Sequence, residues 1–376
     1  MSLLRKKIEI VMIHGSRARL TSFFETFLYL ISLIYAGVAS LRALFYEKGF
    51  LKSRKLPCPV ISIGNMTVGG TGKTPLTIYV AGLLKRLGYK VAVISRGYGG
   101  DKEQSRGIVS NKSKILLSPD AAGDEPYLMA VKLEGVPVLV GRDRFEIGML
   151  AIREFAPDVL VLDDAFQHLQ LYRDLDLVLL DAVRPFGNGH LLPRGVLREP
   201  LNQLVRGDAF ILTRFDPVKS VSDLPVVDKL AEEKPVFQCT HVPDVVRGVK
   251  GSLQPAPLEQ ATYDLDFLKG RRVLAFAGIA GNEDFRMMIA DLGCDVASFL
   301  AFPDHHRYSD QDLKMILRSA DQSGVDCLLT TEKDYVRIAH RISWPLELLA
   351  LGIKISFGEK EKSFNDYLKK AVLEMS

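Results

Sequence analysis

The sequence predicts an α/β protein with two α/β/α sandwich domains, preceded by an apolar N-terminal helix. Three observations lead to this fold class. Short apolar runs alternate with stretches of helical periodicity, which is the pattern of a parallel sheet covered by helices on both faces. The first of these runs leads into a glycine-rich loop and then a helix. The chain has 376 residues, and at about 100–200 residues per domain this length favours two domains.

The composition excludes several classes of protein. Hydrophobic residues make up 47% and charged residues 25% of the chain, which rules out a disordered, collagen-like or coiled-coil protein. The net charge of +4 is too small to indicate nucleic-acid binding, and we expect no nucleic-acid partner. The cysteines are widely separated and form no C-x-x-C pair, which argues against a disulfide framework or a cysteine-rich zinc site and fits a reducing cytoplasm. They are Cys58, Cys239, Cys294 and Cys327.

The positive charge is concentrated at the N-terminus. Residues 1–60 contain ten Lys or Arg and three acids, a net charge of +7, so the rest of the chain sums to −3. Residues 26–41 carry no charge and are rich in Phe, Leu, Ile and Tyr. As a helix this run would be about 24 Å long, which is shorter than the ~30 Å hydrocarbon core of a bilayer. We therefore expect a helix that lies on the membrane surface or dips into it, held by apolar burial and by attraction to anionic lipid.

Three other interpretations of this run stay open. Apolar runs of fewer than 18 residues are often buried core helices. The small residues at 37–39 could form the cleavage site of a signal peptide, although the nucleotide motif described next has no use outside the cytoplasm. A helix that spans the membrane is also compatible with the sequence if flanking residues join it.

A phosphate-binding loop follows the first predicted strand, at 60–63. Residues 64–74 are rich in glycine, and the apolar spacing after them predicts a helix that ends at Gly88. In such a loop Lys73 reaches the β- and γ-phosphates and the Thr74 hydroxyl binds Mg²⁺. Thr67 stands where the usual pattern has its first glycine. A glycine-rich turn without a ligand is the alternative. The predicted ATP-binding residues are Thr67, Gly69, Gly70, Thr71, Gly72, Lys73 and Thr74.

Further strands are predicted at 91–94, 138–140, 159–162, 177–180 and 209–212, which makes the first domain a P-loop NTPase-like parallel sheet. Catalytic groups are expected at the carboxyl ends of such strands. Asp163 and Asp164 follow one strand and Asp181 follows another, and spacing alone does not decide which of them binds Mg²⁺. Asp124 and Glu125 share a loop, where a pair of acids is commonly a solvated turn or the start of a helix.

A second, smaller α/β unit begins near residue 236. Residues 236–240 are predicted to be extended, as a strand or a linker. Further strands are predicted at 272–277, 296–302, 325–329 and within 346–357, and helices at 284–292, 310–319 and 363–372. The predicted division of the chain is therefore 1–56, 57–235 and 236–376. His305 and His306 follow a strand end, where ligands bind in sheets of this kind. On spacing alone they could equally belong to a hydrogen-bonded loop or an incomplete metal site.

Seven motifs, in this order, together resemble the tetraacyldisaccharide 4'-kinase family, whose members phosphorylate the precursor of lipid A. The resemblance extends from the N-terminal helix to about residue 340. The motifs are Gly69-Gly70-Thr71-Gly72-Lys73-Thr74-Pro75, Ser95-Arg96-Gly97-Tyr98-Gly99, Gly123-Asp124-Glu125-Pro126, Asp163-Asp164-Ala165-Phe166-Gln167-His168, Leu191-Leu192-Pro193-Arg194-Gly195 with Leu197-Arg198-Glu199-Pro200, Phe302-Pro303-Asp304-His305-His306, and Thr330-Thr331-Glu332-Lys333-Asp334.

The resemblance implies an activity and a set of site residues. It implies transfer of the γ-phosphate of ATP, with Mg²⁺, to the 4'-hydroxyl of a lipid-linked disaccharide 1-phosphate, producing lipid IVA. By motif, Asp124 resembles the catalytic base, His305 its partner and Lys73 the catalytic lysine of the nucleotide loop. Thr74, Glu125 and Asp163 resemble the Mg²⁺ ligands. Positions near the sugar and its phosphate correspond to Asn65, Arg96, Tyr98, Gln167, His168 and Arg198.

The sequence departs from the family pattern at two positions. Ala165 stands where the family usually has Gly, and Arg194 stands in a motif that often reads Ala. The resemblance places the protein at the cytoplasmic face of the bacterial inner membrane, peripheral or monotopic through the N-terminal helix, and we predict a monomer.

Two other functions compete with this interpretation. The first is a membrane-associated switch ATPase of ParA type, which shares a similar loop but has Lys where this chain has Val68, and lacks a second α/β domain. The second is a nucleotide-hydrolysing chaperone for a metal or cofactor, which would require clusters of Cys and His.

Overall fold

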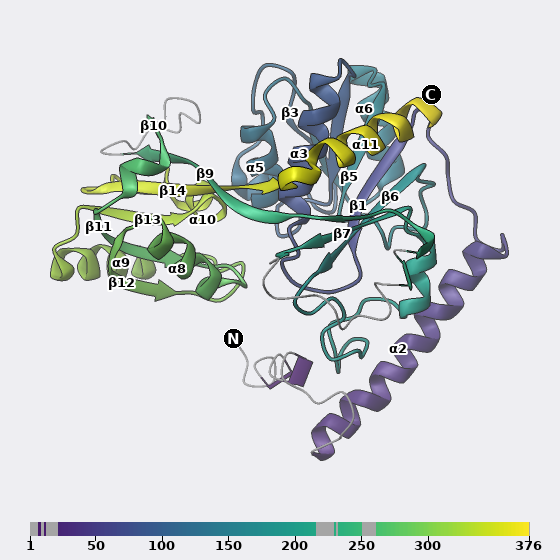
Figure 1. Cartoon of the computed structure of the whole chain (residues 1–376), viewed down its shortest axis with the longest axis horizontal. Coiled ribbons are helices and arrows are strands. Elements are labelled where there is room, and N and C mark those ends of the chain that lie inside the picture. Colours follow the sequence, from purple (N-terminus) through teal and green to yellow (C-terminus); the bar gives the residue numbers. More distant parts are fainter. Residues whose placement is uncertain are drawn as a thin grey trace. The chain divides into compact units, whose positions relative to one another are not determined.

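The computed structural model describes residues 7–8, 11–12, 22–215, 229–230, 232–249 and 261–375 (Figure 1). The chain divides into two compact units. Unit 1 comprises Met1–Arg96, Asp143–Thr240 and Ile355–Ser376, and unit 2 comprises Gly97–Arg142 and His241–Lys354. Of the predicted basic leader, Arg5, Lys6, Arg17 and Arg19 lie outside the described residues.

The apolar segment near the N-terminus forms helix α2 (Phe23–Glu47), and Ser22 caps it by accepting a hydrogen bond from the Glu25 N–H. The helix has 25 residues, so it is about 37 Å long, whereas the charge-free run predicted about 24 Å. The difference arises because Glu25 and Arg42 continue the helix beyond that run. By length and composition α2 could cross a membrane. The residues of α2 that are buried are Glu25, Leu28, Ser32 and Ala43, which decides against a buried core helix.

Six parallel strands form the sheet of unit 1, in the order β2-β5-β1-β6-β7-β8. Every residue of β1, β2, β5 and β7 is buried, as expected for a sheet with both faces covered. This confirms the parallel sheet predicted from the apolar runs. The strands are β1 (Val60–Asn65), β2 (Val91–Ser95), β5 (Val159–Asp163), β6 (Leu175–Asp181), β7 (Ala209–Thr213) and β8 (Val236–Gln238).

Helices and long loops cover this sheet. Helix α3 (Lys73–Arg86) packs on β1, β2 and β5, and α6 (Arg144–Phe155) packs on β2. Side chains from the loops after β5 and β6 pack on alternate residues of β6 and β7, and Phe166, Phe186 and Leu197 are among them. Two further helical elements of the unit are η1 (Leu201–Arg206) and α11 (Glu361–Met375).

Unit 2 begins with a short segment that carries one of the predicted acid pairs. Strands β3 (Arg106–Ser110) and β4 (Val138–Gly141) pair antiparallel. Between them lie α4 (Pro119–Ala122) and α5 (Asp124–Lys132). The Asp124-Glu125 pair therefore forms the first turn of a helix, where carboxylates interact favourably with the helix dipole.

The rest of unit 2 is built on a six-stranded sheet in the order β10-β9-β14-β13-β11-β12. Strands β11, β12, β13 and β14 pair parallel, and β10 pairs antiparallel with β9. The strands are β9 (Thr240–Val249), β10 (Ala261–Tyr263), β11 (Arg272–Ala277), β12 (Asp295–Ala301), β13 (Cys327–Thr331) and β14 (Glu347–Ser356). The helical elements are η2 (Leu265–Leu268), α8 (Asn282–Asp291), α9 (Asp310–Ser323), α10 (Glu332–Ile338) and η3 (Gly358–Lys360), the last in the segment that belongs to unit 1.

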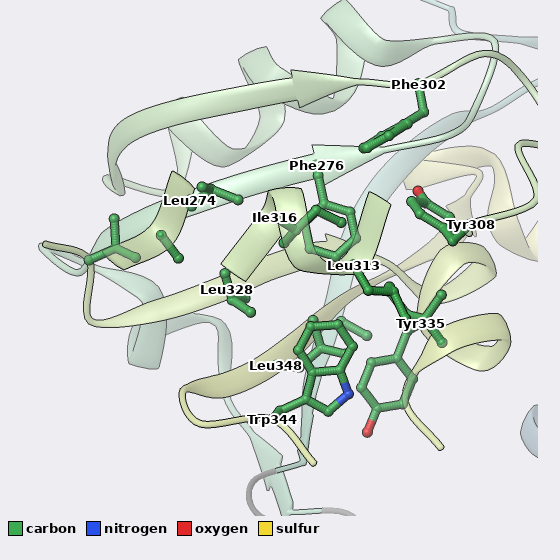
Figure 2. Packing of buried hydrophobic residues seen from close by; sticks show 14 residues of the cluster. Leu274, Phe276, Phe302, Tyr308, Leu313, Ile316, Leu328, Tyr335, Trp344 and Leu348 are labelled. Carbon is green, nitrogen blue, oxygen red and sulfur yellow. The ribbon is translucent and has the colours of Figure 1, made fainter. Parts of the chain in front are cut away.

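Alternation along β11 shows that this second sheet is also covered on both faces. Leu274 and Phe276 pack with Leu313 and Ile316 of α9, in the cluster that Figure 2 shows around Trp344. The neighbouring positions 273, 275 and 277 pack with residues of α8 on the other face. The predicted α/β/α arrangement is therefore present in unit 2.

The two compact units differ from the predicted division at residue 235. Strand β8 hydrogen-bonds to β7 and so belongs to unit 1, where the sequence suggested the start of a second domain. Helix α11 also belongs to unit 1, because Phe364 packs against Phe237 of β8, with ring centroids 5.1 Å apart. Residues 97–142, in contrast, group with unit 2. The ranges 1–56, 57–235 and 236–376 stay a prediction about domains that fold independently.

Candidate active site

The predicted phosphate loop joins a buried strand to the start of a helix in unit 1. Strand β1 ends at Asn65, and α3 begins at Lys73. Gly72 precedes the helix with a positive φ of 88°, and no side chain caps the first turn. The first backbone N–H groups of α3 therefore lack an intrahelical partner and can bind an anion. Strand, loop and helix are arranged as the sequence predicted.

Thr67 replaces the first glycine of the usual pattern without disturbing the loop. It forms an antiparallel bridge with Leu197, and the Val68 N–H donates to the Val196 carbonyl at 2.8 Å. The base of the loop is thus fixed to the segment around residue 197. Asn65 is fully buried, and its side-chain amide donates to the Thr71 hydroxyl at 2.8 Å. In this conformation Asn65 supports the loop.

The two carboxylates after β5 have different partners. Asp163 is 2% exposed and accepts hydrogen bonds from the hydroxyls of Ser95, at 3.1 Å, and Thr77, at 3.2 Å. Asp164 has a positive φ of 51°, which turns it away from its neighbour. It accepts from the Arg198 guanidinium at 2.8 Å and lies 3.7 Å from Lys73 Nζ. Neither Ser95 nor Thr77 was identified as a partner from the sequence.

These contacts define the phosphate-loop cluster, which comprises Lys73, Asp163, Asp164 and Arg198. Burial by itself raises the pKa of Asp164, but the positive charges of Lys73 and Arg198 outweigh it, so that pKa lies below its ordinary value. Asp164 is therefore ionised at neutral pH, and it neutralises part of the charge of the two cations.

Of the other expected site residues in unit 1, two belong to the loop after β5. The Gln167 side-chain amide donates to the Asn65 carbonyl at 2.8 Å, next to the phosphate loop. His168 is mostly buried. Burial and the nearby positive charges of Arg144 and Arg173 lower the pKa of His168 to about 4, so its ring is neutral at pH 7. Arg96 is exposed just after β2, and Thr74 is half-buried in the first turn of α3.

The expected base and histidine of unit 2 lie close together. Gly123, with φ 86°, turns the chain into α5 at Asp124. His305, also with positive φ, lies in the loop after β12, where its N–H donates to the Gly278 carbonyl. His305 Nδ1 is 4.0 Å from Asp124 Oδ2. The adjacent His306 instead contacts Asp312 at 3.1 Å, so His305 is the histidine beside the acid pair.

Helix α10 supplies two cations to this acid pair. Lys333 Nζ is 2.7 Å from Glu125 Oε1 and 3.3 Å from His305 Nε2. Arg337 forms an ion pair with Asp124 and lies 3.3 Å from His305 Nδ1. We call these five residues the acid–base cluster. Burial, then the charge of Lys333, lowers the pKa of His305, so the ring is neutral at pH 7.

Sequence reasoning assigned no role to either cation. Lys333 occurs in one of the seven motifs, whereas Arg337 lies outside all of them. Their spacing of four residues on a helix that follows a strand end was the available signal, since such residues share one helix face. Tyr98, the remaining expected residue of unit 2, is 65% exposed, and its ring makes a T-shaped contact with the His305 ring, with centroids 6.0 Å apart.

Each cluster is assembled within one unit. The phosphate-loop cluster comes entirely from unit 1, and the acid–base cluster entirely from unit 2. Among the residues that the structure describes, no group of three or more His, Cys, Asp or Glu could hold a metal ion. The cysteine- and histidine-rich site expected of a metal chaperone is thus absent from this part of the chain.

Comparison with known proteins identifies the family. A sequence model of the tetraacyldisaccharide-1-P 4'-kinases matches residues 24–373. The chain belongs to this family. The match confirms the resemblance drawn from the seven motifs, and its extent decides against a ParA-type switch ATPase.

Curated relatives of the kinase family match over most of their length. The tetraacyldisaccharide 4'-kinase of Desulfatibacillum aliphaticivorans is 46% identical over 98% of both chains. That of Syntrophus aciditrophicus is 44% identical over 87% of both chains. Among solved structures, an LpxK from Aquifex aeolicus in complex with ATP is 34% identical, with a TM-score of 0.72 over 93% of this chain and 100% of the other. The predicted fold class is therefore confirmed in a relative of known structure.

Proposed function

We propose that this chain transfers the γ-phosphate of ATP to the 4'-hydroxyl of tetraacyldisaccharide 1-phosphate, the reaction that produces lipid IVA. The observation that carries the proposal is the phosphate loop ending at Lys73 in a chain that matches the kinase family over residues 24–373. The solved relative from Aquifex aeolicus, in complex with ATP, supports ATP as the phosphate donor.

The phosphate loop binds the triphosphate in this proposal. Backbone N–H groups of Thr67 and of residues 69–74 surround the phosphates, and Lys73 contacts the β- and γ-phosphate oxygens. Thr74, Asp163 and Glu125 are the proposed Mg²⁺ ligands. Their donor atoms are hydroxyl and carboxylate oxygens, which Mg²⁺ prefers, and the buried Asp163 carboxylate accepts hydrogen bonds from the hydroxyls of Ser95 and Thr77. Bound Mg²⁺ would neutralise negative charge on the phosphates during transfer.

Asp124 is the proposed general base, and His305 assists it. As the 4'-oxygen attacks the γ-phosphorus, its proton passes to the Asp124 carboxylate, the bond from phosphorus to the bridging oxygen breaks, and ADP leaves. A positioned base contributes about 10²–10⁴ in rate. The neutral ring of His305, 4.0 Å from the carboxylate, is available to take up that proton. Lys73 contributes charge stabilisation, which generally supplies much of the rest.

The remaining proposed site residues bind the lipid headgroup. Arginine forks suit a phosphate monoester because they donate two parallel hydrogen bonds, so Arg96 and Arg198 are proposed to contact the 1-phosphate or the transferred phosphoryl group. Tyr98 is exposed and offers a face for a sugar ring. The other polar residues proposed to contact the headgroup are Asn65, Gln167 and His168.

Helix α2 is proposed to hold the enzyme at the cytoplasmic face of the inner membrane as a monomer. Its outer side exposes large apolar side chains, which include Phe23 at 89%, Ile34 at 70% and Val38 at 63% exposure. A helix of this kind binds a bilayer by burying its apolar face, and nearby lysines and arginines add attraction to anionic lipid. The acylated substrate would then need to lift only its headgroup from the membrane.

A transfer assay tests the proposal. The protein is incubated with γ-labelled ATP, Mg²⁺ and tetraacyldisaccharide 1-phosphate in detergent, and the lipid fraction is examined for label. We expect label in the lipid, and loss of about 10²–10⁴ in turnover in Asp124→Asn with ATP binding retained. Absence of lipid label in the wild type would reject the kinase proposal. Near-normal turnover of Asp124→Asn would remove Asp124 from the role of base.

A further inference from the structure

Asp124 and His305 lie together without bonding to each other. The 4.0 Å between Asp124 Oδ2 and His305 Nδ1 exceeds the length of a hydrogen bond. One residue begins helix α5, and the other lies in the loop after β12. A separate group must therefore fix the distance and orientation of these two side chains.

Arg337 contacts both of them. Its NH2 group forms the ion pair with Asp124 and lies 3.3 Å from His305 Nδ1. A guanidinium only donates hydrogen bonds, and so does the ammonium of Lys333 on the opposite ring nitrogen. A neutral imidazole accepts at one nitrogen, and Lys333 already has a close carboxylate partner in Glu125 at 2.7 Å. The His305 ring thus lies between two cations, with Lys333 at Nε2 and Arg337 at Nδ1.

Arg337 is itself held in place. Its NH1 group donates to the His306 carbonyl at 3.1 Å, which ties the guanidinium to the loop that carries His305. NH1 also lies 3.4 Å from Asp334 Oδ1. Asp334 is fully buried and accepts from the Gly278 N–H at 2.9 Å and the Thr331 hydroxyl at 2.8 Å. The arginine thus connects α5 and the His305 loop to the buried base of α10.

We propose that Arg337 is a positioning residue for phosphoryl transfer, because its guanidinium holds the Asp124 carboxylate and the His305 ring in one arrangement. The inference rests on the proposed function. A guanidinium suits this position better than an ammonium, because its planar fork donates in several fixed directions at once, whereas an ammonium is a compact point charge. Misplacing a catalytic group by about 1 Å can cost roughly a hundredfold in rate.

Substitutions at Arg337 test the inference in the full-length protein. We expect Arg337→Gln to lower kcat roughly a hundredfold, with KM for ATP within about twofold of the wild type, because the phosphate loop belongs to the other unit. Arg337→Lys keeps the charge and should recover kcat to within about tenfold of the wild type. Arg341→Gln is the matched control. Arg341 lies one turn further along the chain, where it donates to the Tyr308 carbonyl and pairs with Asp310 at 2.6 Å. Its kcat should stay within about twofold.

A double-mutant comparison separates positioning from simple loss of stability. In an Asp124→Asn background, Arg337→Gln should lower the residual rate by less than about threefold, since groups that act as a unit are non-additive. If Arg337→Gln does not fold, as its melting temperature will show, Arg337→Lys is compared in the same two backgrounds. Two results would overturn the inference, namely a kcat within threefold of wild type in Arg337→Gln, or the same rate loss in both backgrounds. If the wild type labels lipid and either result is found, the inference fails while the proposed function stands.

Discussion

The two clusters of the candidate site share one feature, a pair of adjacent carboxylates, but the partners of these carboxylates differ. Each contains a pair of adjacent carboxylates, Asp163 and Asp164 in unit 1 and Asp124 and Glu125 in unit 2. In unit 1 two hydroxyls donate to one carboxylate, and two cations lie beside the other. In unit 2 each carboxylate faces a cation from helix α10. The surrounding helices and strands thus decide which groups lie next to each carboxylate, and the acid pair itself does not.

The difference follows from the backbone at each pair. Asp163 ends a buried strand, and the left-handed conformation of Asp164 turns the next side chain toward Lys73 and Arg198. Asp124 and Glu125 begin helix α5, and helix α10, which packs beside α5, supplies a cation to each of them. In unit 1 the two neighbouring carboxylates are thus turned to different partners, whereas in unit 2 both pair with one helix.

We expect the largest effect from Lys73→Met, which tests whether the two clusters have different roles. Removing the cation of the phosphate loop should lower kcat by roughly 10²–10³ and weaken ATP binding about tenfold or more, whereas Asp124→Asn should lower turnover alone. Titration calorimetry and steady-state kinetics measure the two quantities. Lys85→Met, in the last turn of the same helix, is the control. Unchanged ATP affinity in Lys73→Met would show that unit 1 does not bind the triphosphate through this loop.

The outer face of α2 predicts the next largest effect. Burying a large aliphatic side chain contributes about 1.5–3 kcal/mol, so the double substitution of Ile34 and Val38 by Gln should weaken binding to anionic vesicles by roughly a hundredfold or more. A vesicle sedimentation assay measures it. Leu373→Gln removes a side chain that is 60% exposed, but in α11, and should leave vesicle binding unchanged. Equal losses in both variants would mean that α2 is not the docking element.

His168 predicts an effect of pH on the stability of unit 1. Its pKa is about 4 in the folded protein and about 6.5 when unfolded. Below pH 6.5 the unfolded chain therefore binds a proton that the folded chain does not, and stability is lost as the pH falls towards 4. By pH 5 the loss amounts to about 2 kcal/mol.

Urea unfolding followed by circular dichroism at pH 7 and pH 5 checks this expectation. His168→Asn should lose about 2 kcal/mol less than the wild type between the two values, because the variant has no ring to protonate. The same pH dependence in both proteins would mean that the titrating group lies elsewhere.

We expect the smallest effect from a substitution of Tyr35, which joins α2 to the phosphate-loop cluster. Its hydroxyl donates to the Arg198 carbonyl at 2.9 Å. Tyr35→Phe removes this bond and should destabilise the protein by about 1 kcal/mol, with a modest rise in KM for ATP through Arg198. Thermal unfolding and kinetics measure both. Tyr46→Phe, on the same helix, is the control, and a matching shift in that variant would contradict a specific role for the Tyr35 bond.

Local patterns in the sequence predicted most of the fold and the position of the phosphate loop. The strand, glycine loop and helix around Lys73 occupy the predicted positions, because their pattern is set by neighbouring residues. Helix α2 was predicted too short, because a charge was taken as its end although charged residues continue helices freely. Two contacts of unit 1 had no local pattern to predict them, because strand β8 is specified by pairing with β7, and the chain's return in α11 is a contact across more than a hundred residues.

The sequence by itself determined the phosphate loop, the alternation of strands and helices, and the motifs that place the chain in its family, since each depends on residues close along the chain. Only the tertiary structure decided which acids share a cation, why His305 and not its neighbour faces Asp124, and that Arg337 joins them. Arg337 and Asp124 are 213 positions apart, and no local spacing encodes such a pairing. It arises when the packing of α5 against α10 brings distant side chains within the range of a hydrogen bond.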